Sequence, residues 1–327
     1  MKILVTGGAG FIGSHTVEAC LKQGHEMIVI DDFNNYYSPQ IKRHNIAPVL
    51  NQIELVEGDI RDPEIIANAF ANTQIDTIIH LAARAGVRPS IDDPELYLST
   101  NNSGTYHLLE AARKNKVKKF LFASSSSVYG VNEKVPFAES DLIASTISPY
   151  AATKLFGEQL CSNYAHVHNL RTVCLRFFTV YGPRQRPDLA ISKFTRLISE
   201  NQPIDRYGDG TTGRDYTYVD DIVQGIMAAL DYEGPMFDIF NLGGSEPILL
   251  KDLIAAIETT LGKKATINEL PEQPGDVPRT SADISKAREL LGYNPQTPLS
   301  KGIPKFIEWY QKTPATGEPY PKPASVA

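Results

Sequence analysis

The sequence predicts an α/β protein in which a doubly wound parallel sheet is followed by a smaller C-terminal α/β region. Short, almost continuously apolar runs alternate with amphipathic stretches along the first half of the chain, as is typical of parallel sheets with helices on both faces. A glycine-rich turn directly follows the first apolar run. Beyond about residue 175 the alternation gives way to loops rich in proline and glycine.

Six runs in the first half have the apolar, β-branched and aromatic residues of buried strands. They are residues 2–6, 26–31, 53–59, 76–82, 118–125 and 172–178. Amphipathic stretches at 14–24 and 101–115 fit helices between them. We therefore assign residues 1–175 to a first domain with this sheet.

The rest of the chain is predicted to form a second, smaller region at residues 176–312. Its expected helices are residues 190–200, 250–261 and 282–292. The strand-and-helix pattern returns at 215–245, so we expect this part of the chain to rejoin the first domain. The tail at 313–327 is rich in proline and has no core-forming pattern, and it is expected to be disordered.

Composition excludes several classes of function. A net charge of −6 over 327 residues argues against sequence-independent nucleic-acid binding, and no apolar run approaches the roughly 18 residues of a membrane span. The cysteines Cys20, Cys161 and Cys174 are far apart in apolar segments, which favours buried thiols over a disulfide framework or a metal site. The chain opens on a strand-like segment with no signal peptide, so a cytoplasmic location is expected.

The turn after the first strand predicts a dinucleotide site of the Rossmann type. Gly7, Gly10 and Gly13 form a G-x-x-G-x-x-G pattern that opens a helix, so that the backbone and the helix N-terminus can approach a pyrophosphate. Asp31 ends the second strand 18 residues after Gly13, where an acidic residue holds the adenosine ribose. With Asp32 it would repel a 2′-phosphate, which favours NAD over NADP.

A candidate proton-transfer pair follows in the first domain. Tyr150 and Lys154 share one face of a predicted helix, where a lysine can lower the pKa of a phenol so that it takes a proton from a substrate hydroxyl. The spacing alone is weak because the chain has 15 tyrosines. Four serines, residues 124–127, end the preceding strand; they can bind the reacting oxygen or merely form a turn or helix cap.

Over residues 1–312 the chain resembles the extended short-chain dehydrogenases/reductases that act on nucleotide sugars. The resemblance is carried by TGGAGFIGSH, DIRD, HLAA, SSSSVYG, the Tyr150–Lys154 pair, GDGTTGRDYTYVDD and PGDVPRTSADISKA. Members of this family transiently oxidise the sugar at C4 with bound NAD. The resemblance implies that Tyr150 is the base, that Lys154 assists it and orients the nicotinamide ribose, and that Ser125 and Ser127 complete the catalytic set.

The same resemblance implies residues for each ligand. The expected cofactor contacts are Gly7, Gly10, Phe11, Ile12, Gly13, Asp31, Asp32, Asn34, Lys42, Asp59, Ile60, Leu81, Ala82, Ala83, Asn101, Ser124, Tyr150, Lys154 and Phe177. Arg214 would hold the diphosphate and Asp276 a uridine ribose. Gln273 stands where hexose epimerases often have a second arginine, and Arg279 is the candidate substitute.

The residues before VYG discriminate between reactions. Family dehydratases carry Asp-Glu there and decarboxylases carry Glu, whereas this chain has Ser126 and Ser127. Without an added carboxylate, dehydration lacks its acid and decarboxylation lacks its family helper. Return of the hydride to the other face of the sugar remains, so the resemblance favours epimerisation.

The segment RFFTVYGPRQRPD, residues 176–188, bears on the sugar. Thr179 replaces the asparagine common in hexose epimerases, and this version resembles UDP-glucuronic acid 4-epimerases, as do residues 34–43 and 81–90. The hydroxyls of Thr179, Ser126 and Ser127, together with Arg186, are expected to bind the C6 carboxylate. Arg184 is expected to pair with solvent or a neighbouring acid. Arg88 is a candidate for a phosphate or carboxylate contact and equally for a structural ion pair.

Three other functions stay open at this point. They are a UDP-glucose or UDP-N-acetylglucosamine 4-epimerase, a UDP-glucuronate decarboxylase, and a non-enzymatic NAD-binding scaffold. The presence of Tyr150, Lys154 and Ser125 argues against the scaffold. Family members are often homodimers, and residues 97–114 and 150–166 are the candidate interface helices. Their amphipathic pattern is explained equally well by packing within one chain.

Overall fold

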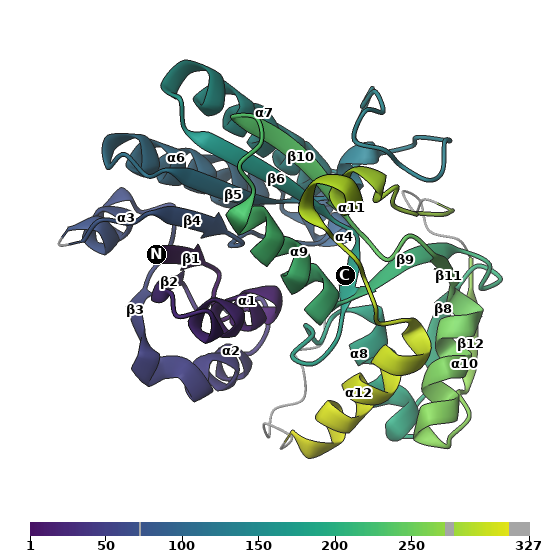
Figure 1. The fold of residues 1–327 in the computed structure, drawn as a ribbon. Helices are drawn as coiled ribbons and strands as arrows, with labels where there is room; N and C mark the ends of the chain where they lie inside the picture. The colour runs from purple at the N-terminus through teal and green to yellow at the C-terminus, as the bar shows by residue number, and fades with distance from the viewer. Residues whose placement is uncertain (72, 272–277, 314–327) are drawn as a thin grey trace.

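The structure, a computed structural model, describes residues 1–71, 73–271 and 278–313. Its centre is a seven-stranded parallel sheet in the order β10-β6-β5-β4-β1-β2-β3 (Figure 1). The strands are β1 Lys2–Thr6, β2 Glu26–Asp31, β3 Ile53–Glu57, β4 Thr77–His80, β5 Lys119–Ser125, β6 Arg171–Phe177 and β10 Phe237–Leu242. The predicted doubly wound α/β class is confirmed, and six of these strands coincide with the six apolar runs.

Helices cover both faces of this sheet. They are α1 Phe11–Lys22, α2 Pro39–Ile46, α3 Pro63–Phe70, α6 Gly104–Lys114, α7 Pro149–His168 and α9 Val219–Asp231. Ile3 and Val5 of β1 belong to the core beneath α1 and α9, whereas Leu4 belongs to the core beneath α3, α6 and α7. This alternation follows from the pleat of a strand, which sends successive side chains to opposite faces.

Short elements connect these layers. They are a 3-10 helix at Ala47–Gln52, α4 Val87–Asp92, α5 Pro94–Tyr97, a π-helical turn at Leu98–Ser103 that runs into α6, and a 3-10 helix at Ser126–Tyr129. Four of them follow the carboxyl ends of β4 and β5, so this edge of the sheet carries most of the short irregular elements.

Apart from α9 and β10, the elements beyond β6 form a second layer with two smaller sheets, beside the carboxyl end of the large sheet (Figure 1). One sheet has the order β11-β9-β7 and the other pairs β12 with β8. The elements are β7 Thr179–Tyr181, α8 Ala190–Ser199, β8 Ile204–Tyr207, β9 Gly213–Tyr218, β11 Pro247–Leu249, α10 Leu250–Leu261, β12 Ile267–Leu270, α11 Ser285–Leu291 and α12 Leu299–Lys312. Helix α12, which contains Pro304, was not predicted from the sequence.

The order of the strands places a crevice beside β1. The chain winds outward from β1 through β2 and β3, then returns to β4 on the other side of β1. At such a reversal the loops after neighbouring strands diverge, and ligands bind outside the carboxyl ends. Cys20, Cys161 and Cys174 are buried free thiols. Of the described residues, no helix combines the length and apolar character needed to cross a membrane. The predicted tail lies almost wholly outside the described residues.

Candidate active site

A cavity of about 460 Å³ opens at the carboxyl ends of the central strands. Most of the residues predicted for cofactor, catalysis and sugar line it together. They are Gly7, Gly10, Phe11, Ile12, Gly13, Asp31, Asp32, Asn34, Lys42, Asp59, Ile60, Leu81, Ala82, Ala83, Ser124, Ser125, Ser126, Ser127, Tyr150, Lys154, Phe177, Thr179 and Arg186. Segments far apart in the sequence therefore meet at one site.

The glycine-rich turn is closed too tightly for side chains. Gly7 has φ of +71°, and a Cβ built on it would lie 2.8 Å from the backbone nitrogen of Ala82. A Cβ on Gly13 would lie 2.0 Å from the carbonyl oxygen of Gly7. Helix α1 begins at Phe11, so its first N–H groups border a cradle of bare backbone. Such a cradle fits a pyrophosphate.

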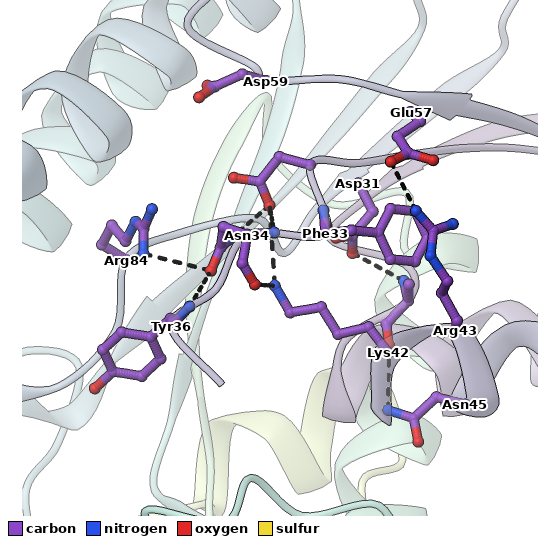
Figure 2. Close-up of polar contacts among 12 residues, drawn as sticks. Asp31, Phe33, Asn34, Tyr36, Lys42, Arg43, Asn45, Glu57, Asp59 and Arg84 are labelled. Carbon is purple, nitrogen blue, oxygen red and sulfur yellow. Dashed lines mark hydrogen bonds and ion pairs between the residues drawn. The ribbon is translucent and has the colours of Figure 1, made fainter. Parts of the chain in front are cut away.

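Asp31 braces this turn. Its Oδ2 accepts a hydrogen bond from the N–H of Ala9 and its Oδ1 accepts one from the N–H of Phe33, both at 3.0 Å (Figure 2). Burial raises the pKa of Asp31, against the opposing charge of Lys42 and these two bonds. Asp32 accepts from the N–H of Asn34 at 3.1 Å and lies 4.0 Å from Lys42 Nζ. Both carboxylates line the cavity, and Asp31 has a structural task as well.

The segment after β2 folds over this end of the cavity. Lys42 Nζ donates to the carbonyl of Asn34 at 3.0 Å, and Asn34 Oδ1 accepts from the N–H of Tyr36 at 3.1 Å and from Arg84 at 3.4 Å (Figure 2). Lys42 also stands 5.0 Å from the ring centre of Tyr37. Tyr36 and Arg84 line the cavity as well, and Arg84 was not among the residues that the sequence suggested for the site.

Two other predicted cofactor residues have local partners. Asp59 lines the cavity and pairs with Arg61 at 2.6 Å; burial acts to raise the pKa of Asp59, but its bonds with Arg61 outweigh this and lower it. Asn101 is 3% exposed and does not line the cavity. Its amide donates to the carbonyl of Arg84 at 3.0 Å and to Thr153 Oγ1 at 2.9 Å. Asn101 therefore ties the loop after β4 to α7 from behind the cavity wall.

Tyr150 and Lys154 project from the first two turns of α7. Ser148 caps this helix, accepting from the N–H of Ala151 at 3.1 Å, and Pro149 occupies its first position. Lys154 Nζ donates to the carbonyl of Ala123 at 2.7 Å and lies 6.0 Å from the ring centre of Tyr150. Burial lowers the pKa of Lys154 to about 8.

The electrostatics of Tyr150 differ from the sequence prediction. Burial raises its pKa, and the hydrogen bond with Ser125 and the charge of Arg186 act in the opposite direction. The cation that favours the phenolate is thus Arg186 rather than Lys154, whose ammonium is directed to Ala123. Lys154 is not among the groups that shift the pKa of Tyr150 in this structure, and its assistance to Tyr150 stays a prediction.

Of the two roles that the sequence left open for the serines, the structure shows the helix cap, while binding of the reacting oxygen stays a prediction. Ser125 Oγ caps the 3-10 helix at Ser126–Tyr129 by accepting from the N–H of Ser127 at 3.2 Å. The hydroxyls of Ser125 and Ser127 lie 2.8 Å apart. Because Ser125 also bonds Tyr150, one hydroxyl joins the cap to the proton-transfer pair.

Tyr97 supports Tyr150 and was missed in the sequence. It is 2% exposed, and its ring meets that of Tyr150 edge to face with centroids 6.3 Å apart. Its hydroxyl donates to the carbonyl of Ala85 at 3.1 Å. Nothing in the local sequence connects Tyr97 with Tyr150, so this contact could be recognised only from the three-dimensional structure.

The two arginines of the 176–188 segment have different partners. Arg184 pairs with Glu18 of α1 at 2.5 Å, as expected of a structural cation. Arg186 lines the cavity, stacks 5.0 Å from the ring centre of Tyr36, and donates to both carboxylate oxygens of Asp188 at 3.0 and 2.6 Å. The sequence did not predict this internal partner.

Three other predicted substrate residues, Arg88, Arg214 and Arg279, do not line the cavity. Arg88 lies 5.1 Å from the ring centre of Tyr207. Arg214 is on β9. The backbone of Arg279 forms a bridge with Gly213, the residue that precedes Arg214. The two arginines are thus neighbours across adjacent backbone segments. Gln273 and Asp276 lie outside the described residues.

This strand order, the bare glycine cradle and the Tyr150–Lys154 pair on one cavity define a dinucleotide-dependent enzyme of the extended short-chain dehydrogenase/reductase class. Residues 3–243 match the NAD dependent epimerase/dehydratase family, and the chain belongs to that family. NAD is therefore the cofactor that the cavity is built to hold.

Relatives narrow the class further. The chain is 42% identical to UDP-glucuronate 4-epimerase 1 of Arabidopsis thaliana over 95% of this chain and 76% of that protein. It is 40% identical to UDP-glucuronic acid 4-epimerase from Bacillus cereus, solved with UDP-glucuronic acid and NAD, with a TM-score of 0.89 over 95% of this chain and 99% of that one. UDP-glucose 4-epimerase from Thermotoga maritima, solved with UDP-glucose, has the same TM-score and coverage at 33% identity. The fold alone does not choose between these sugars.

Proposed function

We propose that this protein is an NAD-dependent isomerase that converts UDP-glucuronic acid to UDP-galacturonic acid at C4 through a transient 4-keto sugar. The observation that carries the proposal is the sugar end of the cavity. The hydroxyl-bearing residues Ser126, Ser127 and Thr179 line the same cavity as Tyr150 and Arg186. The cavity's carboxylates among the described residues are Asp31, Asp32 and Asp59, all at the dinucleotide end.

The chain's own groups account for the proton chemistry. NAD, when bound, takes the hydride from C4 and returns it. Tyr150 takes the proton of the 4-hydroxyl and gives it back, and its hydrogen bond with Ser125 favours the phenolate. Lys154 keeps a positive charge beside the nicotinamide end while its bond to Ala123 fixes its position. No net oxidation results.

Among the described residues that line the cavity near Tyr150, no added carboxylate serves the competing outcomes of a 4-keto sugar. Elimination across C5 and C6 requires a further acid and base, yet the turn that follows Ser125 supplies only the hydroxyls of Ser126 and Ser127. Loss of carbon dioxide is easiest when the breaking bond aligns with the ketone. Hydroxyls and a guanidinium that hold the carboxylate oppose that alignment.

The choice of sugar is testable by comparing substrates. We expect kcat/KM to be highest for UDP-glucuronate and much lower for UDP-glucose and UDP-N-acetylglucosamine, because neutral sugars leave the cation at Arg186 without a new partner. Equal kcat/KM values for charged and neutral sugars would favour the neutral-sugar epimerase instead. The Thermotoga maritima enzyme with UDP-glucose shows that the same fold accommodates that alternative.

The nucleotide end is proposed from the second layer. Arg214 and Arg279 would bind the diphosphate, supported by the bridge that sets their backbones side by side. Asp276 would hold the uridine ribose. Arg214→Ala is expected to raise the KM for every UDP-sugar to a similar extent, and this uniformity separates it from changes at the sugar end.

We also propose a homodimer that pairs helices α6 and α7 of two copies. Three large apolar side chains on and before these helices, Leu98, Tyr106 and Phe156, are 45–49% exposed. Such a patch fits an interface between copies. Sedimentation should show a dimer that Phe156→Glu converts to a monomer; a wild-type monomer would contradict this. A cytoplasmic location is proposed as well, supported by the buried free thiols.

A further inference from the structure

Glu158 lies one helical turn beyond Lys154 on α7 and is 1% exposed. Its Oε1 accepts from Ser124 Oγ at 2.5 Å, and Arg176 donates to both carboxylate oxygens at 2.8 and 2.7 Å. Lys154 Nζ donates to the carbonyl of Ala123. The ammonium and the carboxylate thus hold two consecutive residues of β5, directly before the catalytic Ser125.

The ionisable groups around Lys154 come from three elements. They are Tyr150, Glu158 and Cys161 on α7, Cys174 and Arg176 on β6, and His80 on β4. Burial lowers the pKa of His80 to about 3 and raises that of Cys174, so both are neutral near pH 7. Arg176 is a cation. Glu158 is therefore the carboxylate that balances the two buried cations, Lys154 and Arg176.

We propose that Glu158 is a positioning residue that keeps the proton on Lys154 and orients Ser124 and the strand end beneath Tyr150. The role given to Lys154 rests on the proposed function. Burial alone drives the proton off Lys154, and among the opposing groups Glu158 is a carboxylate held in place by a two-point bond with Arg176. Removal of that carboxylate would leave the buried Arg176 without its partner and remove a negative charge that favours the charged lysine.

A purely structural role makes a different prediction. If the Glu158–Arg176 pair only joins α7 to β6, then breaking it from either end should loosen the packing in the same way. If charge matters, the two ends have opposite effects. We expect Glu158→Gln to lower the pKa of Lys154 by about one unit and Arg176→Met to raise it by about one unit. In the double variant, which is neutral at both positions, the pKa of Lys154 should be close to its wild-type value.

The pKa of Lys154 can be followed directly by nitrogen-15 NMR of lysine-labelled, NAD-loaded protein, with Lys154→Met to identify the signal. Shifts in the same direction, or none, in the two single variants would overturn the proposal. If Glu158→Gln does not fold, the pKa of Lys154 is compared between Arg176→Met and the double variant, and it should be higher in Arg176→Met.

Activity provides a second measurement. The kcat of Glu158→Gln relative to wild type should fall increasingly as pH rises from about 7 to about 9, as Lys154 loses its proton early, whereas KM should change little. A constant ratio across this range would contradict a role in protonation. Because the NMR titration needs no turnover, a wild-type protein inactive on UDP-glucuronate would count against the proposed function and leave this proposal open to its own test.

Discussion

Arg186 and Asp188 form a two-point ion pair at the wall of the cavity, with Nε–Oδ1 at 3.0 Å and Nη2–Oδ2 at 2.6 Å. The sequence predicted that Arg186 would bind the sugar carboxylate but offered no internal competitor. Asp188 occupies the same fork of the guanidinium that a substrate carboxylate would use. The carboxylate of a charged sugar must therefore either share the guanidinium of Arg186 with Asp188 or displace Asp188 from it.

Substitution of Arg186 tests its place in recognition. Arg186→Ala should raise the KM for UDP-glucuronate by about 10- to 100-fold, the worth of a hydrogen bond to a charged group, and that for UDP-glucose far less. Steady-state kinetics on both sugars measure this. Arg184→Ala, which breaks the pair with Glu18 instead, is the matched control and should leave both values near wild type. Equal losses on the two sugars for Arg186→Ala would show that Arg186 does not read the carboxylate.

Asp188 should act in the opposite direction. Asp188→Asn removes the competing charge, so the KM for UDP-glucuronate should fall by about two- to fivefold, in keeping with a partly exposed ion pair. The KM for UDP-glucose should not change. A rise for both sugars would instead mean that Asp188 holds Arg186 in its working position.

Tyr150→Phe should abolish proton transfer while preserving cofactor binding. We expect kcat to fall by about 10²- to 10⁴-fold, the usual contribution of a positioned acid or base. Tyr310→Phe on helix α12 serves as the control. The NAD content of the purified protein, measured after acid release, should match wild type in both. Retention of full activity by Tyr150→Phe would remove Tyr150 from the mechanism.

Gly13→Ala should displace the cofactor. Because its Cβ would lie 2.0 Å from the carbonyl oxygen of Gly7, the turn must move away from α1, at a cost of about 1–3 kcal/mol in stability. We expect purified protein with little bound NAD and a lower Tm. Gly24→Asn is the control, since Gly24 has φ of +77° and nothing within 4 Å of its Cβ position. Normal NAD content in Gly13→Ala would contradict the inference that the glycine-rich turn binds the cofactor.

Substitution of Asp215 on β9 tests how the second layer is held together. Its buried carboxylate accepts from the N–H groups of Gly244, Ser245 and Ala282 at 2.6–3.0 Å. Asp215→Asn points an amide donor at one of these donors, so the free energy of unfolding should fall by about 1–3 kcal/mol. Denaturant unfolding measures the loss, with the exposed Asp220→Asn as control. No difference between the two variants would rule out this anchoring.

The large sheet was predictable because its strands are buried on both faces. Such strands read as unbroken apolar runs, and the six predicted runs coincide with β1 to β6. The second layer was harder. Helix α12 carries an internal Pro304 and the strands β7 and β11 have three residues each; their stability comes from tertiary packing rather than from local pattern.

The site was predictable where a motif fixes the backbone and not where contacts cross the fold. Gly7 and Gly13 were predicted from their spacing, Tyr150 and Lys154 from their spacing together with the family resemblance, and the structure brings all four to one cavity. Asn101 was expected at the cofactor, yet its amide is used up by Arg84 and Thr153. No local signal in the sequence links such partners, because they meet only through the packing of separate elements.

The central claim is that the hydride removed from C4 returns to the same carbon of a sugar that keeps its carboxylate. UDP-glucuronate carrying deuterium at C4, incubated with the purified protein and no added NAD, tests this when the products are followed by NMR. The account predicts UDP-galacturonate with deuterium retained at C4. A UDP-pentose, loss of the deuterium to solvent, or no turnover of UDP-glucuronate would contradict it.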